Sequence, residues 1–464
     1  MANAFINFFK EPAPKEIIKD KSEITAKYKH FRTRLMYSLY LGYVVSYIGR
    51  KNLSIAMPSI CQTLGVTKTQ LGLLGGTFYV TYGVGKMVNG ILADRSNVRT
   101  FFPVALICAA VCLFCFAISV TFSFLPFTVL LWLMSFFWGA SGWFQSMTFP
   151  PIAKSLSYWF TKKERGMKWS LISTSHQIGV FCAIGVANVA IATMGWQGAF
   201  YIPGAISLLA GFWLFNRLRD KPRSLGLPAV EDYEKMTGKF DASEIEEETV
   251  KEEKKDEKKM SYMQMLTKYI LVNPVVWILS ISFMFIYVVR TASEDWIVTY
   301  FTDKGDGLFK ASSKLLVLSV FGATGTMVSG FVSEKLFKGK RTPVNILFLI
   351  GLLLSLFGFS MNLGAIAILD YVYAALIGVF CAGLQNLVGL HIVESCASNV
   401  ASAANGFGGT FSYIGAFLAS SGTGFIADKF GWSGAFNYWI VCTVLAIVLV
   451  LIVAPCEKKR RSNS

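Results

Sequence analysis

The sequence predicts an all-α polytopic membrane protein with twelve transmembrane helices in two six-helix bundles. Three observations lead to this prediction. Apolar stretches of about 20 residues recur along most of the chain, and each is long enough to cross the hydrocarbon core of a bilayer. Only 16% of the 464 residues are charged, which is less than in an average soluble domain. Short segments of the first half also recur in the second half at a nearly constant offset.

The twelve predicted spans follow one another closely, apart from one long polar segment in the middle. Several of them contain internal Gly or Pro, which membrane helices tolerate. The spans lie near residues 35–60, 70–93, 101–123, 126–153, 168–193, 197–217, 268–300, 311–334, 343–362, 366–394, 401–427 and 433–455.

The polar segments divide the chain into five predicted parts. The central segment contains EEETVKEEKKDEKK, whose mixed charge and low complexity are typical of a flexible or partly helical linker. The parts are a cytoplasmic N-terminal segment (1–34), a first bundle (35–217), a cytoplasmic linker (218–267), a second bundle (268–455) and a cytoplasmic tail (456–464).

Basic residues alternate between successive connections, which predicts the orientation in the membrane. The connections near 61–69, 122–126, 193–197 and 362–366 hold one Lys between them, whereas those near 95–99, 162–168 and 335–341 are basic. The connection at 301–313 is an exception, since it holds Lys304 and Lys310. The positive-inside rule places both termini in the cytoplasm. The net charge of +16 is explained by these loops, and no stretch is typical of a nucleic-acid-binding face.

The two halves of the chain show an internal repeat. GWQGAF at 195–200 recurs as GWSGAF at 431–436, an offset of 236. GILADRSNVR at 90–99 has a looser counterpart in GFVSEKLFKGKR at 330–341, an offset of 240. Such repeats are typical of transporters, whose binding sites lie near the bilayer midplane at the interface between the repeats.

The same offset pairs two arginines that lie inside apolar spans. Arg50 follows Tyr47 in the first half, and Arg290 follows Tyr287 with the same spacing in the second half. A charge within the membrane is costly and therefore indicates a functional site. We expect the two arginines at matching depth on facing helices, forming a paired cationic site.

Two guanidinium groups in a low-dielectric cavity favour an anion with at least two charges. A phosphate monoester is nearly dianionic at neutral pH and matches the planar fork of guanidinium. Carboxylates or sulfate remain alternatives. Either arginine could instead form a structural salt bridge, and for Arg290 the candidate partners are Glu294 and Asp295, four and five residues further on.

Three further polar side chains inside the spans are candidates for the same site. His176, in LISTSHQIGVF, can donate to phosphate and can titrate near neutral pH, or it can be a structural histidine. Lys51 can join the site or pair elsewhere, because on a helix it points about 100° away from Arg50. Lys86 can line the cavity, or it can extend toward the membrane surface.

The sequence gives no indication of an enzyme, a metal site or a cofactor. The nine cysteines fall mostly in the spans. Cys108, Cys112 and Cys115 share a helix face, but no His or acid joins them, so we interpret them as packing residues. We also find no acid/base constellation within the spans.

The motifs along nearly the whole chain resemble the organophosphate:phosphate antiporter family of the major facilitator superfamily. The motifs are YIGRKNLSIAMP, YGVGKMVNGILADRSN, FPP with WFTKKERG, STSHQIG, YVVRTASEDW, SEKLFKGKR, GLHIVE and ANGFGGTFSYIG. Segments such as KDKSEITAKYKHFR, LRDKPRSLGLPAV and LTKYILVNPVVWILS are most similar to the hexose-phosphate transporter and sensor branch.

This resemblance implies the major facilitator fold in a multi-pass inner-membrane protein, with exchange of a sugar phosphate for inorganic phosphate. It implies phosphate-binding roles for Arg50 and Arg290 and a supporting role for His176. It also suggests that Lys51, Lys86 and Asp295 belong to an internal charge network. The chain departs from the family at Ser319, where members often have Glu, and at 382–389, where a Gly-Pro pair is replaced.

The resemblance leaves alternatives for the activity and for the partners. The protein could be a membrane sensor that binds external hexose phosphate and signals to a membrane kinase, or an antiporter for glycerol-3-phosphate or phosphoglycerate. We expect a monomer that takes a sugar phosphate, such as glucose 6-phosphate, and phosphate as substrates.

Overall fold

We describe a computed structural model of the protein, over residues 8–121, 124–237, 269–362, 366–396 and 400–462. The regular elements in these ranges are helices, which confirms the predicted all-α fold. The first half holds α2 (Lys21–Ile48), α3 (Asn52–Leu64), α4 (Lys68–Asp94), α5 (Val98–Ile118), α6 (Phe127–Ser146), α7 (Phe149–Trp159), α8 (Lys162–Met194) and α9 (Gly198–Arg217). The second half holds α13 (Pro274–Asp303), α14 (Leu308–Phe331), α15 (Arg341–Asn362), α16 (Ala367–Glu394) and α17 (Ala401–Ser462).

Each of the twelve predicted spans overlaps a described helix. By length and mean hydropathy alone, nine helical segments of the described residues could cross a membrane, with residues 403–455 of α17 counted once. Gly431 has φ of 68° and divides α17 at the point between the last two predicted spans. The two spans outside the nine are α2 with α3, and α4. The charges of Arg50, Lys51 and Lys86 fall within these two spans and lower their hydropathy.

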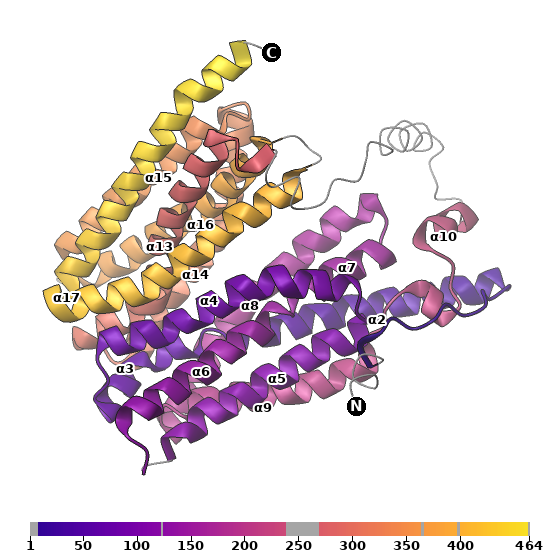
Figure 1. The fold of residues 1–464 in the computed structure, drawn as a ribbon, viewed down its shortest axis with the longest axis horizontal. Helices are drawn as coiled ribbons and strands as arrows, with labels where there is room; N and C mark the ends of the chain where they lie inside the picture. Colours follow the sequence, from indigo (N-terminus) through magenta and orange to yellow (C-terminus); the bar gives the residue numbers. More distant parts are fainter. Residues whose placement is uncertain (1–7, 122–123, 238–268, 363–365, 397–399, 463–464) are drawn as a thin grey trace.

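The helices form two groups that meet along a seam (Figure 1). In the first group α4 packs on α6 and α5 on α9, and in the second α13 packs on α17 and α14 on α16. Across the seam α4 lies along α17, and α3 contacts α13. The division of the chain at residues 34, 217, 268 and 455 stays a prediction, and residues 238–267 of the linker and the side chains of 456–464 lie outside the described residues.

Close glycine contacts repeat between the two groups. A Cβ at Gly179 of α8 would lie 2.5 Å from the Cβ of Tyr47, and one at Gly415 of α17 would lie 3.1 Å from the Cβ of Tyr287. The offsets are 236 for the glycines and 240 for the tyrosines, as in the sequence repeat. Glycine therefore brings an equivalent helix against the helix that carries each arginine.

One set of hydrogen bonds and ion pairs between the groups lies at the start of α4. The side chain of Asp428 accepts from the backbone nitrogen of Lys68 (3.1 Å) and from that of Thr69 (2.6 Å). The ammonium of Lys68 also pairs with Asp303 at 3.0 Å. These contacts join the groups at the end of the molecule away from α10 (Val230–Thr237).

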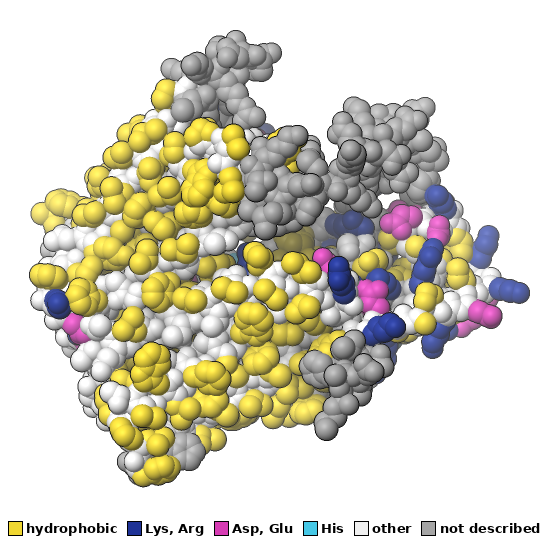
Figure 2. Space-filling view, viewed as in Figure 1, with side chains coloured by type: hydrophobic (Ala, Val, Ile, Leu, Met, Phe, Trp, Pro, Cys, Tyr) yellow, Lys and Arg dark blue, Asp and Glu magenta, His cyan; other side chains and the backbone are white. Residues whose placement is uncertain are grey.

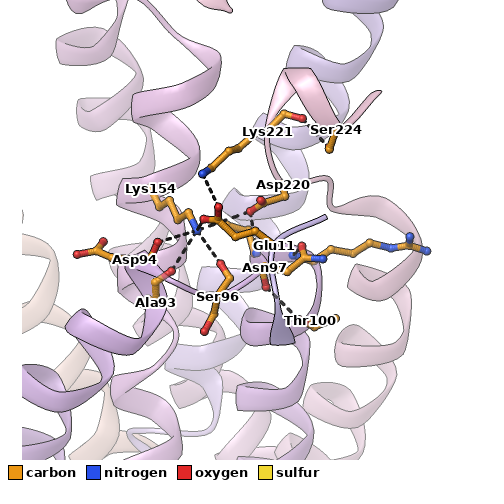
Figure 3. Close-up of polar contacts among 12 residues, drawn as sticks. Glu11, Ala93, Asp94, Ser96, Asn97, Thr100, Lys154, Asp220, Lys221 and Ser224 are labelled. Carbon is orange, nitrogen blue, oxygen red and sulfur yellow. Dashed lines mark hydrogen bonds and ion pairs between the residues drawn. The ribbon is translucent and has the colours of Figure 1, made fainter. Parts of the chain in front are cut away.

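At the other end, Lys154 of α7 holds several chain segments together (Figure 3). Its ammonium donates to the carbonyl oxygens of Ser96 (2.7 Å) and of Ala93 and Asp94 (both 3.2 Å), in the turn that carries the LADRSN motif. Ala93 and Asp94 lie in the last turn of α4, where helix carbonyls run out of amide donors four residues further on. The buried lysine thus fixes the end of α4 against α7.

Glu11 ties the N-terminal segment to the same place. It accepts from Lys154 and from Lys221, both at 2.6 Å. Burial acts to raise the pKa of Glu11, but the hydrogen bonds from the two lysines hold this pKa below its ordinary value. The backbone nitrogen of Asn97 donates to Phe9 at 2.7 Å. The segment before α2 therefore packs against the first group, at the end where α4 finishes and α5 begins.

Charged side chains gather at this end of the molecule (Figure 2). Lys and Arg surround the start of α2 and α10, while apolar side chains cover most of the rest of the visible surface. Large apolar side chains such as Trp132, Phe136 and Phe181 are more than half exposed on the spans. An apolar surface of this kind is expected of helices that face lipid.

Candidate functional site

A cavity of about 870 Å³ lies between the two groups of helices. Side chains from α4, α8, α13, α14, α16 and α17 line it, together with the turn between α2 and α3. The structure brings all seven sequence-predicted site residues to this cavity: Arg50, Lys51, Lys86, His176, Arg290, Glu294 and Asp295.

A break in the first span places Arg50. Helix α2 ends at Ile48 and α3 begins at Asn52, so Arg50 lies in a turn rather than on a continuous helix. The backbone carbonyl of Gly49 accepts from the side chain of Gln145 at 3.1 Å. Irregular backbone within a membrane is tolerated where protein groups satisfy it or where it lines a cavity.

Aromatic rings surround the guanidinium of Arg50. Its central carbon lies 4.2 Å from the ring centre of Tyr82, 4.9 Å from that of Tyr47 and 5.5 Å from that of Phe78. The Nε atom is buried and has no hydrogen-bond partner, and we find no carboxylate within ion-pair distance among the described residues. The rings stabilise the cation, and its Nε–H has no acceptor among the described residues.

Arg290 occupies the equivalent position in a different setting. Helix α13 is continuous from Pro274 to Asp303. The guanidinium of Arg290 pairs with Glu294 one turn further on at 2.9 Å, and lies 5.4 Å from the ring centre of Tyr287. The structure therefore contains the i,i+4 ion pair that the sequence left open, on the wall of the same cavity.

Lys51 crosses the seam. Its ammonium lies 2.6 Å from Glu294 and 3.5 Å from Asp295. The hydroxyl of Tyr79, on α4, donates to Asp295 at 2.6 Å. The expected 100° separation from Arg50 does not apply, because both residues lie at the helix break. Lys51 instead joins the first group to the carboxylates of the second.

His176 and Lys86 complete the cavity wall. The Nδ1 atom of His176 lies 2.9 Å from the carbonyl oxygen of Ser173. A carbonyl oxygen only accepts, so this geometry assigns the proton to Nδ1 and leaves Nε2 of the neutral ring as an acceptor. The ammonium of Lys86 lies 5.7 Å from the ring centre of Tyr413, and we find no ion pair for it among the described residues.

The charges around the cavity do not cancel. Four cations line it, Arg50, Lys51, Lys86 and Arg290, against two carboxylates, Glu294 and Asp295. With the carboxylates ionised and His176 neutral, the excess is two positive charges. Charges in a low-dielectric cavity are costly when uncompensated, so the cavity favours a dianion.

Our sequence reasoning missed the tyrosines that hold these charges. Tyr79 and Tyr82 lie on α4 with Lys86, and the i,i+4 spacing of Tyr82 and Lys86 was a signal for a shared face. Tyr79 is offset by 240 from Ser319, which also lines the cavity. Tyr79, whose hydroxyl contacts Asp295, is therefore equivalent in the repeat to Ser319, where family members often have Glu.

Comparisons with known proteins show the family of this chain. Residues 39–420 match the Major Facilitator Superfamily. The chain is 38% identical to a probable hexose phosphate transport protein of Chlamydia trachomatis serovar D, over 97% of this chain and 96% of the relative. It is 34% identical to the membrane sensor protein UhpC of Escherichia coli K12, over 97% of both chains, and 31% identical to the hexose-6-phosphate:phosphate antiporter of the same organism, over 91% and 90%.

The chain belongs to the organophosphate:phosphate antiporter family of this superfamily. Among solved structures, it resembles a bacterial homologue of the human lysosomal transporter Spinster, in an inward-facing and occupied conformation. The TM-score is 0.71 at 14% identity, over 92% of this chain and 97% of the other. This likeness shows the major facilitator fold, and the protein is accordingly a multi-pass membrane protein.

Proposed function

We propose that the protein is a secondary antiporter that takes up a sugar phosphate, such as glucose 6-phosphate, in exchange for inorganic phosphate. The observation that carries this proposal is the excess of two positive charges around a cavity shared by both halves. A phosphate monoester supplies close to two negative charges at neutral pH. The names of the hexose phosphate relatives support the same substrate class.

In this proposal the phosphoryl group bridges the two arginines. Arg50 has no carboxylate to give up, so it binds the anion without prior rearrangement. Arg290 must exchange its contact with Glu294 for a phosphate oxygen. Glu294 already contacts Lys51 at 2.6 Å and can keep that partner. Anion binding therefore changes how the halves are held together.

This arrangement explains why exchange would be favoured over net transport. To change the side on which the cavity opens, the halves must rock about a site that contains Arg50 and Arg290. Without an anion, the uncompensated charge of Arg50 would be enclosed, and breaking the compensation of a buried charge is strongly unfavourable. Either substrate neutralises it and permits closure.

We further propose that the protein is a monomer of the cytoplasmic (inner) membrane with both termini in the cytoplasm. The positive-inside rule and the basic end of the molecule support this orientation. The contacts of Asp428 and Asp303 with α4 join the halves at the opposite end. With this orientation, the central cavity faces the cytoplasm.

Reconstituted vesicles test the antiport. Vesicles loaded with inorganic phosphate should take up labelled glucose 6-phosphate at least about tenfold faster than vesicles loaded with buffer that contains neither phosphate nor sulfate, since empty reorientation encloses a charge. Equal rates in the two preparations would show a uniporter or an ion-coupled symporter and would overturn the antiport mechanism.

A membrane sensor is the second candidate function. The 34% identity to UhpC favours it. A sensor of this kind would bind hexose phosphate and signal to a membrane kinase. Saturable binding of glucose 6-phosphate with no flux in either vesicle preparation would select the sensor.

Competition distinguishes the possible organophosphates. Phosphate exchange should be inhibited by glucose 6-phosphate at lower concentration than by glycerol-3-phosphate or phosphoglycerate. The reverse order would leave the antiport mechanism intact but would assign the protein a three-carbon substrate.

A further inference from the structure

A second cavity, of about 850 Å³, lies outside the central site, between α2 and the first turns of α8. Three cationic side chains line one end of it: Lys29, Arg32 and Lys168. Apolar and aromatic side chains, among them Tyr37, Leu41 and Leu171, line the other end. We call this cavity the α2–α8 groove.

The basic end of the groove carries more positive than negative charge. Glu164 is the acidic residue among its lining residues, and it lies 3.3 Å from the guanidinium of Arg32. The ammonium of Lys168 lies 5.5 Å from the ring centre of Phe160, and we find no ion pair for Lys29 or Lys168 among the described residues. Three cations against one carboxylate leave an excess of two positive charges.

Aromatic rings hold Arg32 in place at the floor of the groove. Its guanidinium carbon lies 5.3 to 5.6 Å from the ring centres of Tyr28, Phe160 and Tyr233. Its Nε and Nη2 atoms are buried and have no hydrogen-bond partner in the described part of the chain. The cation is therefore fixed by stacking, with one long ion pair to Glu164.

The groove continues from the basic end along the apolar part of α2. Leu41 and Leu171 are 46% and 47% exposed, although both lie on helices that enter the membrane. Lys29 and Leu41 are twelve residues apart, which is about 18 Å along a helix. That length is comparable to half of the roughly 30 Å hydrocarbon core. The groove thus has a basic end that suits a phosphate group and an apolar end that suits an acyl chain.

We propose that the α2–α8 groove binds an anionic phospholipid, with its phosphodiester at Lys29, Arg32 and Lys168 and an acyl chain along Tyr37, Leu41 and Leu171. Charge complementarity selects an anionic over a zwitterionic lipid, as in basic pockets between transmembrane helices. Tyr233 of α10 lines the same groove. The bound lipid therefore contacts the segment that leads into the linker.

Native mass spectrometry of the full chain tests this inference. The protein is reconstituted in vesicles of equal parts phosphatidylcholine and phosphatidylglycerol, extracted in mild detergent, and its retained lipids are identified. The test variant is the double substitution Lys29→Gln and Lys168→Gln, which spares the stacked Arg32. The control is Lys27→Gln with Lys340→Gln, which removes the same charge at two positions outside the groove, one half-buried and one exposed.

The wild type and the control should retain phosphatidylglycerol in preference to phosphatidylcholine, and the test variant should lose about tenfold or more of that preference. Equal preference in the test variant and the control would overturn the site, because the lipid would then be held by general surface charge. Displacement of phosphatidylglycerol by millimolar inorganic phosphate would also overturn it, since the groove would then be a site for a soluble anion.

Discussion

The two arginines of the central cavity occupy equivalent positions in the repeat but have opposite surroundings. Arg50 lies at a helix break, against three aromatic rings and without a carboxylate within ion-pair distance. Arg290 lies on a continuous helix and is paired with Glu294. The repeat therefore specifies the positions of the two arginines. The residues around each arginine, which differ between the halves, determine whether a carboxylate pairs with it.

This difference assigns separate tasks to the two halves. Under the proposed antiport, Arg50, whose Nε–H has no acceptor among the described residues, provides the permanent part of the anion site. Arg290 is compensated when the cavity holds no anion, and its partner Glu294 also contacts Lys51 across the seam. In this proposal the contacts of the second half change when the anion binds, while those of Arg50 in the first half do not.

The largest expected effect follows from substitution of the uncompensated arginine. Arg50→Lys keeps the charge but loses the planar fork, so phosphate exchange should fall by about 100-fold, the loss of one or two charge-assisted hydrogen bonds. Arg290→Lys should lose only about tenfold, because lysine can keep the i,i+4 pair with Glu294. Initial rates of phosphate exchange in vesicles measure both.

Equal losses in these two variants would mean that the surroundings do not differentiate the arginines. Near-normal exchange in Arg50→Lys would remove Arg50 from the site altogether. The thermal unfolding midpoint of each purified variant is the control, and it should stay close to that of the wild type.

The next effect concerns the carboxylate that is shared across the seam. Glu294→Gln leaves Arg290 uncompensated and raises the charge excess of the cavity from two to three. Phosphate should then bind more tightly and leave more slowly, so the KM for phosphate and the maximal exchange rate should both fall, the rate by about tenfold. Glu394→Gln is the matched control, because Glu394 pairs with Arg341 outside the cavity. A raised KM in Glu294→Gln would argue against this role.

How far the sequence predicted this site can be judged from Arg50. Its membrane position and its pairing with Arg290 follow from the apolar stretches and from the offset of 240. The helix break does not, since a single glycine such as Gly49 is tolerated in an unbroken membrane helix. The partner that satisfies the break, Gln145, is 96 residues away, and nothing in the local pattern identifies it.

Lys154 illustrates a second limit of sequence reasoning. A lysine near the end of a predicted span suggests a side chain that extends toward water. In the structure it is buried and donates to three backbone carbonyls and to Glu11. Every residue has a backbone carbonyl, so the sequence does not indicate which carbonyls will accept from Lys154. These contacts can be identified only from the structure. The twelve spans were predictable because the hydropathy of a segment follows from its own residues and does not depend on which groups they contact.

A smaller functional effect is expected at His176, which lies near Arg50, the arginine without a paired carboxylate among the described residues. Its ring centre lies 5.4 Å from that of Tyr47, which in turn contacts Arg50. His176→Asn keeps a polar side chain but cannot titrate, so the KM for phosphate should rise by about three- to tenfold and the pH dependence of exchange should flatten. An unchanged pH profile with a raised KM would make His176 a neutral hydrogen-bonding group. No change in either quantity would make it structural.

The smallest effect tests the helix break itself. The glycine contacts Gly142 to Phe78 and Gly378 to Leu318 repeat between the halves with the offsets of 236 and 240. Gln145 therefore corresponds to Cys381, which is buried beside the continuous helix α13. Gln145 satisfies the carbonyl of Gly49, whereas an unbroken helix satisfies its own carbonyls and needs no donor at Cys381.

Gln145→Met should therefore lower the free energy of unfolding by about 1 to 3 kcal/mol, since it leaves a buried carbonyl unsatisfied at nearly constant volume. Cys381→Ala should cost less than about 1.5 kcal/mol, because only a small apolar group is lost. Thermal unfolding in detergent measures both variants. A larger loss for Cys381→Ala would show that the packing around Arg290 depends on that side chain more than the turn at Arg50 depends on its hydrogen bond. In that case the packing of the first half, rather than the hydrogen bond from Gln145, would stabilise the turn between α2 and α3. The turn would then contribute to the anion site only through Arg50.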